Sequence, residues 1–502
     1  MRLQTAGSLW LQEHFKLTRF VLTHRSYIGQ NARLELTPTG EVNQVYGPKY
    51  APATDTVMAH LEFSLKYDDL HLAFLKAVFD QVSGEEIAAY VAGSPTGKYA
   101  RKIGFLYEFL TGRQIVLAEA VGGNYADLLE EEKYFTGMVV KIRKWRINNN
   151  LLGTAAFCPI VRKTSALAEV LQHDLRQQVA QLKETYDLET FSRAIHYLYS
   201  KETRSSYEIE KEKPSPERME RFIALLSRAG RESSEQLLGE ENLTQLQNAI
   251  VDPRFAASGY RNFQNYIGQT LPNYVELIHF ICPPPSFVPS LMEGLKETAT
   301  KSDGASALVR AAIISFGFVF IHPFEDGNGR LHRFLIHDML VRDGVVPEGL
   351  IIPVSAHMLS HMRDYDKTLE NYSKPLMLLV QYTKAANGEL EVINQDEVEG
   401  YFRYPDLTDQ TVFLAQTIQA TITDDMPQEL AFIQRYDETK RDLQQIVDMP
   451  DKELNLMILF LHQNKGTFPK RRRKDFAKLT DDEIERMEHA YREVFELSAD
   501  LK

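Results

Sequence analysis

The chain has 502 residues, of which 44% are hydrophobic and 25% are charged, so its composition is that of a folded globular protein rather than a disordered or fibrous one. Its formal net charge of -12 excludes the overall basic character of a general nucleic-acid binder. At this length we expect two to four packed units rather than one core.

Cysteine usage and hydrophobicity place further limits on the class of protein. Cys158 and Cys282 are the two cysteines, and neither has the C-x-x-C or Cys/His spacing of a disulfide framework or a zinc ribbon. The first residues lack a signal-peptide core, and the longest apolar run, Ala311–Ile321, is too short to cross a bilayer. We therefore expect a cytoplasmic protein with no membrane partner.

The first 185 residues are expected to form an α/β flank in two parts. Residues 1–115 are predicted as an N-terminal helical region, with helical patterns at Glu85–Ala92 and Tyr99–Leu110 and helix breakers around Leu36–Pro52. Residues 116–185 contain short apolar runs separated by Gly and Asn, such as Gly137–Ile142. This pattern predicts a small β-containing insert followed by a linking helix.

Beyond Ser165 the apolar spacing is that of helices, for example at Glu189–Tyr199 and Glu235–Ile250. The exception is Tyr274–Pro289, whose β-branched and aromatic residues and three consecutive prolines predict an extended, exposed hairpin edge. We expect a core at residues 186–395 and a C-terminal helical region at 396–502. The predicted fold class is therefore mainly α, with one small β-hairpin in its core.

The last helix of the C-terminal region has a clear start signal. Thr480 and Glu483 form a capping box that opens a predicted helix over Asp481–Leu497.

The segment Ile321–Arg333, IHPFEDGNGRLHR, carries the chemistry. It follows one apolar helical run, Ala305–Ile321, and precedes another, so it predicts a loop that leads into a helix N-terminus. Gly327, Asn328 and Gly329 can take positive φ, which would turn successive backbone N–H groups towards one concavity. A concavity of this kind at a helix N-terminus binds phosphate.

Four further side chains in this segment suit nucleotide chemistry. Arg330 and Arg333 lie three residues apart, so their guanidinium groups can neutralise a polyphosphate. Asp326 offers a hard oxygen ligand of the kind that Mg²⁺ uses together with phosphate oxygens. His322 is suited to act as a general base towards a hydroxyl. The combination predicts transfer of part of a nucleotide to a hydroxyl group.

The pattern His-Pro-Phe-x-x-Gly-Asn-Gly-Arg-x-x-Arg resembles the signature of the Fic (filamentation induced by cAMP) family, and all of its fixed positions are present. The resemblance implies a protein adenylyltransferase that moves AMP from ATP to a Ser, Thr or Tyr hydroxyl of a target protein, with Mg²⁺ as cofactor. It implies a helical Fic core with a flap hairpin. Motif-level similarity extends over about residues 200–376.

The resemblance also implies a role for each fixed position of the motif. These roles are His322 as the base, Phe324 as a core anchor of the loop, Asp326 as the Mg²⁺ ligand, Gly327, Asn328 and Gly329 as the anion hole for the α- and β-phosphates, and Arg330 and Arg333 as partners of the β- and γ-phosphates.

Two more segments resemble parts of Fic proteins that handle the target and the adenine. Tyr274–Pro289 lies where the family has its flap, which aligns a target strand, although a proline-terminated surface loop has the same pattern. HMRDYDKTL resembles the adenine-binding helix, and Tyr365 and Leu369 share one face of it. That spacing is equally typical of ordinary core residues.

SYEIEK, at Ser206–Lys211, resembles the [ST]-x-x-x-E-[GN] motif of self-inhibited Fic proteins. Ser206 and Glu210 fit the motif, and Glu210 is expected to pair with Arg333 and exclude the γ-phosphate. Lys211 departs from Gly or Asn, which leaves the end of that helix open. The alternative is a solvated, charged helix.

Other functions are weighed against adenylyl transfer. A nucleotide-sensing regulator could contact nucleic acid through the KRRRK cluster at Lys470–Lys474, but a solvated loop between helices explains that cluster better. A Fic enzyme that removes AMP, or one that uses another nucleotide, is a further alternative. The predicted partners are ATP and a target protein, with a homodimer as an additional option. GSPTGKY at Gly93–Tyr99 lacks P-loop spacing and predicts a turn.

Overall fold

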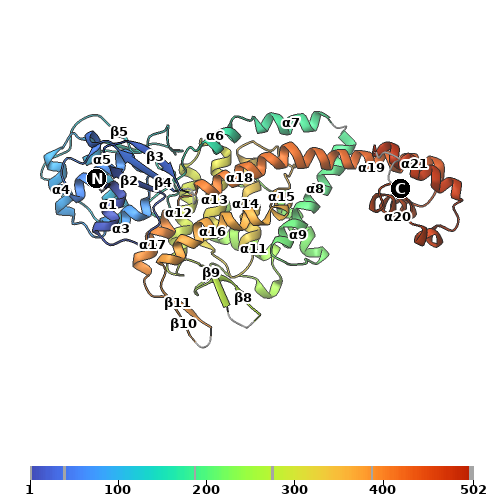
Figure 1. Ribbon diagram of the computed structural model, residues 1–502. Helices are drawn as coiled ribbons and strands as arrows, with labels where there is room; N and C mark the ends of the chain where they lie inside the picture. Colours follow the sequence, from blue (N-terminus) through green and yellow to red (C-terminus); the bar gives the residue numbers. More distant parts are fainter. Residues whose placement is uncertain (1–2, 38–40, 186–187, 273–275, 386–387, 497–502) are drawn as a thin grey trace. The chain divides into compact units, whose positions relative to one another are not determined.

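The computed structural model describes residues 3–37, 41–185, 188–272, 276–385 and 388–496. Its contacts separate two compact units, of which unit 1 contains Met1–Asp174 and Glu202–Gln419, and unit 2 contains Leu175–Lys201 and Ala420–Lys502. Helices dominate both units (Figure 1), so the predicted mainly α fold is confirmed. The boundaries drawn from the sequence at residues 115, 185 and 395 divide the chain differently and stay predictions.

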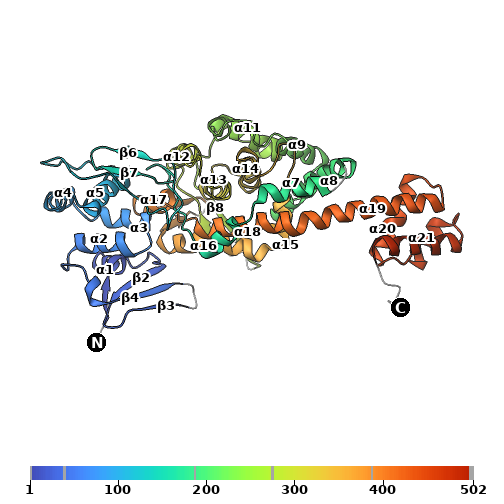
Figure 2. The same cartoon turned by 90° about the horizontal axis from the view of Figure 1, so that it is seen from above.

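Unit 1 begins with a four-stranded sheet of order β1-β2-β4-β3 (Figure 2), in which β2 and β4 are parallel and the outer pairs are antiparallel. Helices α1 and α2 pack against it around Ala6, Ile28 and Phe63. The sequence pattern predicted none of these strands, because each has only three to five residues. The elements of this part are β1 (Gln4–Ala6), α1 (Gly7–His14), β2 (His24–Ile28), β3 (Arg33–Leu36), β4 (Val42–Tyr46), η1 (Pro48–Tyr50), α2 (Val57–Tyr67), α3 (Leu72–Phe79), α4 (Gly84–Gly93) and α5 (Lys98–Thr111).

The predicted helices at Glu85–Ala92 and Tyr99–Leu110 are confirmed as α4 and α5, and the GSPTGKY segment forms the turn between them. A three-stranded sheet follows, with order β5-β7-β6. Fully buried Trp145 anchors it to α5, where its indole N–H donates to Glu108 at 2.7 Å and its ring lies against Gly104. The elements are β5 (Ala126–Asp127), β6 (Val140–Ile142), β7 (Ile147–Asn149) and the linking helix α6 (Ser165–Leu171).

The centre of unit 1 is α13 (Ala307–Ile321), which lies beside α14 (Asn328–Arg342). Every residue of α13 except Ala307 is buried, as expected for a helix that is apolar on all sides. The expected single helix at Glu235–Ile250 is split in two around Gly239. The surrounding elements are α9 (Pro216–Leu226), α10 (Ser234–Leu237), α11 (Glu240–Ile250), η2 (Pro253–Phe255), α12 (Val288–Lys301), α15 (Val354–Ser360), α16 (Met362–Leu379), α17 (Gln395–Arg403) and α18 (Thr408–Ala420).

Two β-hairpins project from the core, as Figure 1 shows. The first pairs β8 (Tyr266–Thr270) with β9 (Glu276–Ile281), and the second pairs β10 (Tyr382–Lys384) with β11 (Leu390–Val392). An ion pair between Lys384 and Glu276 ties one to the other. The predicted extended segment Tyr274–Pro289 therefore holds for β9, whereas residues 274 and 275 lie outside the described residues and Val288 already begins α12.

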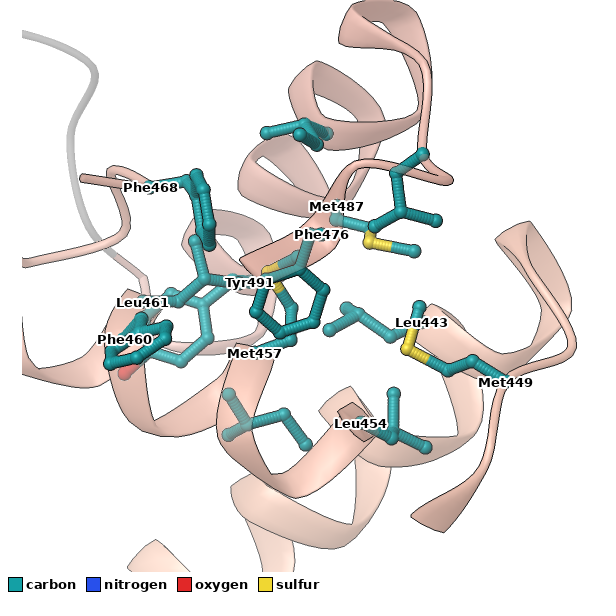
Figure 3. Packing of buried hydrophobic residues seen from close by; sticks show 13 residues of the cluster. Leu443, Met449, Leu454, Met457, Phe460, Leu461, Phe468, Phe476, Met487 and Tyr491 are labelled. Carbon is teal, nitrogen blue, oxygen red and sulfur yellow. The ribbon is translucent and has the colours of Figure 1, made fainter. Parts of the chain in front are cut away.

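Unit 2 has its own hydrophobic core (Figure 3), to which Leu443, Met457, Leu461 and Tyr491 contribute. The capping box at Thr480 is confirmed and opens α21, while the KRRRK cluster lies in η4. The elements are α7 (Leu175–Thr185), η3 (Thr421–Asp425), α19 (Met426–Ile446), α20 (Asp451–Gln463), η4 (Lys470–Phe476) and α21 (Asp481–Val494). Helix α8 (Leu188–Ile209) begins in unit 2 and ends in unit 1. None of the helices in the described part of the chain combines the length and apolar character needed to cross a membrane.

Candidate active site

The loop between α13 and α14 presents an imidazole nitrogen that can accept a proton. His322 ends α13 in a left-handed conformation, with φ of 53°. Its Nδ1 lies 3.1 Å from the carbonyl oxygen of Val319. Because a carbonyl can only accept, Nδ1 must carry the hydrogen, and Nε2 keeps its lone pair. Burial, together with the positive charge of Arg261, lowers the pKa of His322 to about 4, so the ring is neutral near pH 7.

Phe324 and Asn328 hold this loop in shape. Phe324 is fully buried, as expected for an anchor in the core. The side chain of Asn328 accepts the backbone N–H of Phe324 at 3.0 Å and donates to its carbonyl at 2.9 Å. These two hydrogen bonds hold the Asn328 amide against the backbone of Phe324, and its backbone N–H belongs to the first turn of α14.

The expectation of three positive φ angles is corrected by the structure. Gly327 alone of the three takes the left-handed conformation, with φ of 85°, and it caps the N-terminus of α14. Asn328 and Gly329 already belong to the helix, whose first backbone N–H groups have no partner within it. The backbone donors at this point are therefore those of a helix N-terminus, which favours a negatively charged group.

The carboxylate of Glu210 lies directly over this helix N-terminus. A Cβ atom at Gly329 would come within 2.1 Å of Glu210 Oε1, so the missing side chain leaves room for a negatively charged group there. Glu210 Oε1 also accepts a hydrogen bond from Arg333 Nη2 at 2.8 Å. The structure thus brings together the two residues that the sequence predicted to pair.

Arg333 is fully buried and is held mainly by α8. It donates from Nε to the hydroxyl of Ser206 and from Nη2 to the carbonyl of Ser206, both at 2.8 Å. Burial opposes its charge, but the nearby carboxylate of Glu210 raises the pKa of Arg333. Among the described residues, Nη1 has no hydrogen-bond partner. A buried donor without a partner is costly, so this nitrogen suits an anionic ligand.

Arg330 makes a separate set of contacts. Its Nη2 lies 3.0 Å from Glu212 Oε1 and 2.7 Å from Asp326 Oδ1, and Nη1 donates to Glu212 Oε2 at 3.3 Å. The guanidinium also lies over the ring of Tyr207. Arg218 reaches the same Glu212 at 2.8 Å. Glu212, which the sequence analysis had not singled out, is therefore shared by two arginines.

Asp326 is the loop carboxylate that contacts Arg330. Its Oδ1 accepts from the backbone N–H of Gly327 at 2.6 Å and pairs with Arg330. In the described part of the chain, no group of three or more His, Cys, Asp or Glu side chains could hold a metal on its own. A single carboxylate fits Mg²⁺, which takes its remaining ligands from phosphate oxygens and water.

Helix α8 and α14 are joined by a row of polar contacts at helical spacing. Glu202, at 0% exposure, bonds His337 Nε2 at 2.8 Å and the backbone N–H of Ser355 at 2.8 Å. Ser206 and Glu210 follow at intervals of four residues, so all three lie on one face of the segment. The register of α8 that places Glu210 over the helix N-terminus is fixed by this row.

The departure at Lys211 is explained by the backbone at the end of α8. Lys211 has φ of 58°, and its N–H donates to the carbonyl of Glu208 at 2.9 Å. This is the left-handed termination that Gly or Asn usually provides. The turn survives with lysine, although at some cost in backbone strain.

The predicted adenine residues lie on α16 but differ in exposure. Tyr365 is buried beside His332 and Phe413, whereas Leu369 is half-buried. Burial raises the pKa of Tyr365 to about 12, so its hydroxyl stays protonated. The adenine role of both residues stays a prediction.

Comparison with known proteins agrees with this geometry. Residues 237–340 match the family model described as Fic/DOC family. The chain contains a Fic/DOC domain. It is 26% identical over 170 residues to the probable protein adenylyltransferase aq_aa38 of Aquifex aeolicus (strain VF5), which covers 30% of this chain and 51% of that protein. It is 33% identical over 103 residues to protein adenylyltransferase fic-1 of Caenorhabditis elegans, which covers 20% of this chain and 17% of that protein.

The alignments are partial. The chain spans about half the length of the Aquifex relative and less than a fifth of the nematode one. A crystal structure of a Fic family protein from Desulfovibrio desulfuricans G20 superposes with a TM-score of 0.37 and 16% identity, covering 68% of this chain and 86% of that one.

Sequence reasoning missed two carboxylates next to the Fic domain. The i, i+4, i+8 spacing of Glu202, Ser206 and Glu210 was a readable signal for the first. Glu212 gave no such signal, because its direction depends on the left-handed turn at Lys211. Both residues, like Ser206 and Glu210, lie outside the residues that the Fic/DOC family model matches.

Proposed function

We propose that this chain is a protein adenylyltransferase that transfers AMP from ATP to a Ser, Thr or Tyr hydroxyl of a target protein. The observation that carries the proposal is the position of a neutral His322, with Nε2 unprotonated, beside a helix N-terminus that also presents Arg330 and Arg333. The names of the relatives in Aquifex and Caenorhabditis support the same chemistry.

The reaction follows from the groups that the loop presents. The target hydroxyl oxygen attacks the α-phosphorus of ATP while His322 Nε2 takes its proton. The bond from the α-phosphorus to the bridging oxygen breaks, and pyrophosphate leaves. The N–H groups of the first turn of α14, with Arg330 and Arg333, stabilise the negative charge on the phosphates. Asp326 would hold Mg²⁺, which neutralises phosphate charge when it is bound.

The same proposal includes self-inhibition by Glu210. Its carboxylate occupies Arg333 and the space above Gly329, where the phosphates of ATP would otherwise lie. Ser206 holds Nε and Nη2 of the same guanidinium. ATP can therefore bind productively only when Glu210 moves away.

The test is labelling with [α-³²P]ATP of the full chain and of a cell lysate, followed by mass spectrometry of the labelled proteins. We expect weak labelling by wild type and markedly stronger labelling by Glu210→Gly. Arg333→Ala in the Glu210→Gly background should remove the gain, because relief matters only if the freed arginine is used. Transfer of no label by any variant would refute the proposed activity, whereas equal labelling by wild type and Glu210→Gly would refute only the inhibition.

A further inference from the structure

Arg261 is a buried arginine that is surrounded by carbonyl groups. It is 6% exposed and lies between η2 and β8, five residues before the first residue of the hairpin. Its Nε donates to the carbonyl of His322 at 2.8 Å, and its backbone N–H donates to the carbonyl of Pro323 at 2.8 Å. Its Nη1 and Nη2 donate to the carbonyls of Phe263 and Pro283 at 2.8 and 2.7 Å. No ion pair holds it within the described part of the chain.

These contacts join two parts of the proposed reaction site. His322 and Pro323 belong to the catalytic loop, whereas Phe263 and Pro283 lie at the base of the β8–β9 hairpin. Burying a guanidinium without a carboxylate partner costs free energy of folding. Stability alone therefore does not explain why an arginine lies at this position. A planar guanidinium can satisfy several carbonyls with fixed directions, which a lysine ammonium cannot reproduce.

We propose that Arg261 is a positioning residue, which holds His322 in its left-handed conformation and fixes the base of the hairpin relative to it. The proposal rests on the proposed function, in which His322 is the base. Loss of the hydrogen bonds from Arg261 to these carbonyls would displace Nε2 of His322 from the target hydroxyl, while leaving the phosphate-binding arginines in place. Errors of about 1 Å in such a geometry cost about 100-fold in rate.

The experiment compares Arg261→Lys and Arg261→Gln in the Glu210→Gly chain. Both variants are expected to lower kcat for labelling by about 100-fold, with KM for ATP unchanged, because both lose the planar fork. Only Arg261→Gln also removes the charge beside His322, so only this variant should move the acid limb of the pH profile upwards. Asp326, the other charged group that acts on His322 in this background, is unchanged.

Arg101 offers a matched control. It is also a buried arginine that donates to carbonyls, those of Asn124 and Arg146, at 2.9 and 2.8 Å. Arg101→Gln should lower stability without changing kcat or the pH profile. An NMR titration of His322 in the apo chain, with the signal assigned by comparison with His322→Asn, reports on the contact between Arg261 and His322 and does not depend on AMP transfer.

The outcomes separate the two proposals. If the His322 titration moves upwards in Arg261→Gln but kcat does not change, Arg261 acts on His322 through its charge alone, and the positioning role is overturned. If the Glu210→Gly parent itself transfers no label, the proposed function fails, and the titration in the apo chain still reports on Arg261. If neither the titration nor kcat differs from the parent, or if Arg101→Gln has the same effect on kcat, the positioning role is overturned.

A second inference comes from Glu212 and stands on different contacts. Glu212 binds Arg330 through both carboxylate oxygens, at 3.0 and 3.3 Å, and Arg218 holds the same carboxylate at 2.8 Å. Its backbone N–H donates to the carbonyl of Tyr207 at 3.0 Å. Helix α8 thus places Glu210 beside Arg333, and the turn at Lys211 directs Glu212 to Arg330.

We infer that Glu212 is a second inhibitory carboxylate, which competes with the phosphates of a nucleotide for Arg330. This too rests on the proposed nucleotide site. Removing Glu210 alone would leave Arg330 engaged, so the two carboxylates must leave together for full binding. We expect Glu212→Gln to bind ADP about 10-fold more tightly than wild type. Arg330 would then be free to make one charge-assisted hydrogen bond to a phosphate of ADP.

Isothermal titration with ADP tests this on wild type, Glu210→Gly, Glu212→Gln and the double variant. Glu208→Gln is the control, because Glu208 is an exposed carboxylate of the same segment. The double variant should bind more tightly than either single one. If Glu210→Gly alone reaches the affinity of the double variant, the role of Glu212 is overturned, and if no variant binds ADP, the nucleotide site itself is refuted.

Discussion

At the scale of single residues, His322 is the group whose protonation state decides whether the proposed transfer can begin. His322→Ala should lower the labelling rate by about 10² to 10⁴, because a general base acts only in the transition state. ADP affinity should be unchanged, since Arg330, Arg333 and backbone N–H groups hold the phosphates. Single-turnover labelling and calorimetry on the same samples measure both quantities. Substantial residual labelling would remove His322 from the base role.

The lowered pKa of His322 also predicts a pH dependence. Because the pKa of the folded-state imidazole is about 4, against an ordinary value of 6.5, the ring stays neutral from pH 8 down to about pH 5. The unfolded chain binds this proton more readily, so the contribution of His322 to the free energy of unfolding falls as pH drops from 6.5 towards 4. We expect kcat of the Glu210→Gly chain to show no limb near pH 6.5. A limb there would mean that the ring titrates as an exposed histidine.

Lys211 makes a prediction about the stability of the inhibited form. A lysine in the left-handed region costs about 1 kcal/mol relative to glycine, which has no Cβ. Lys211→Gly should therefore raise the melting temperature and lower labelling, because the turn that ends the segment after Glu210 and directs Glu212 to Arg330 becomes more favourable. Lys213→Gly is the control, since Lys213 is exposed and has no positive φ. Equal melting temperatures for Lys211→Gly and wild type would contradict the strain argument.

At the scale of elements, the row of contacts between α8 and α14 holds Glu210 in the position of the proposed inhibition. Glu202→Ala would leave His337 and Ser355 buried without their partner, at a cost of about 3 to 5 kcal/mol. With α8 less firmly held, Glu210 leaves Arg333 more often, so labelling should rise as the melting temperature falls. Thermal melts and [α-³²P]ATP labelling report the two effects.

A neighbouring residue on the same helix supplies the comparison. Arg204 is exposed, so Arg204→Ala removes a side chain from α8 without touching the row. It should change neither stability nor labelling. If Glu202→Ala loses stability but gains no activity, the row holds α8 in place without controlling Glu210.

The sequence allowed the elements with long periodic patterns or fixed motifs to be predicted. Helices α4 and α5 and the capping box of α21 follow from local spacing alone. The strands of the N-terminal sheet could not be found in this way, because each is short and gains its stability from pairing with a strand far along the chain. The conformation of the motif loop was only partly foreseeable, since whether Gly329 turns or continues the helix is decided by packing.

The candidate site likewise contains residues that a local motif predicts and residues that only the tertiary structure brings together. His322, Asp326 and the two arginines follow from a contiguous motif, and Ser206 and Glu210 from a short one. Arg261 and Glu212 do not, because each acts through partners 60 to 120 residues away, such as His322 and Arg330. Contacts at such separations depend on tertiary structure and leave no local pattern.

At the scale of the whole molecule, the proposed chemistry lies within unit 1, while unit 2 has a hydrophobic core of its own. The KRRRK cluster of unit 2 is partly used inside that unit. Arg473 donates to the carbonyl of Phe476 at 2.6 Å and to Asp481 at 3.0 Å, and Arg472 lies over the ring of Phe460. These contacts favour a structural role for two of its arginines over a contact with nucleic acid.

Separate cores predict that the two units lose stability separately. Leu461 is fully buried in the core of unit 2, and Leu461→Ala should lower the free energy of unfolding of that unit by about 2 to 5 kcal/mol. Hydrogen exchange followed by mass spectrometry should show faster exchange in α19, α20 and α21, and unchanged exchange in α13 and α14. Leu459, on the same helix, is 46% exposed, so Leu459→Ala should change neither the free energy of unfolding of unit 2 nor the exchange of its helices. Faster exchange in α13 and α14 after Leu461→Ala would mean that the two cores unfold as one cooperative unit, because a cavity in one core could then destabilise the other.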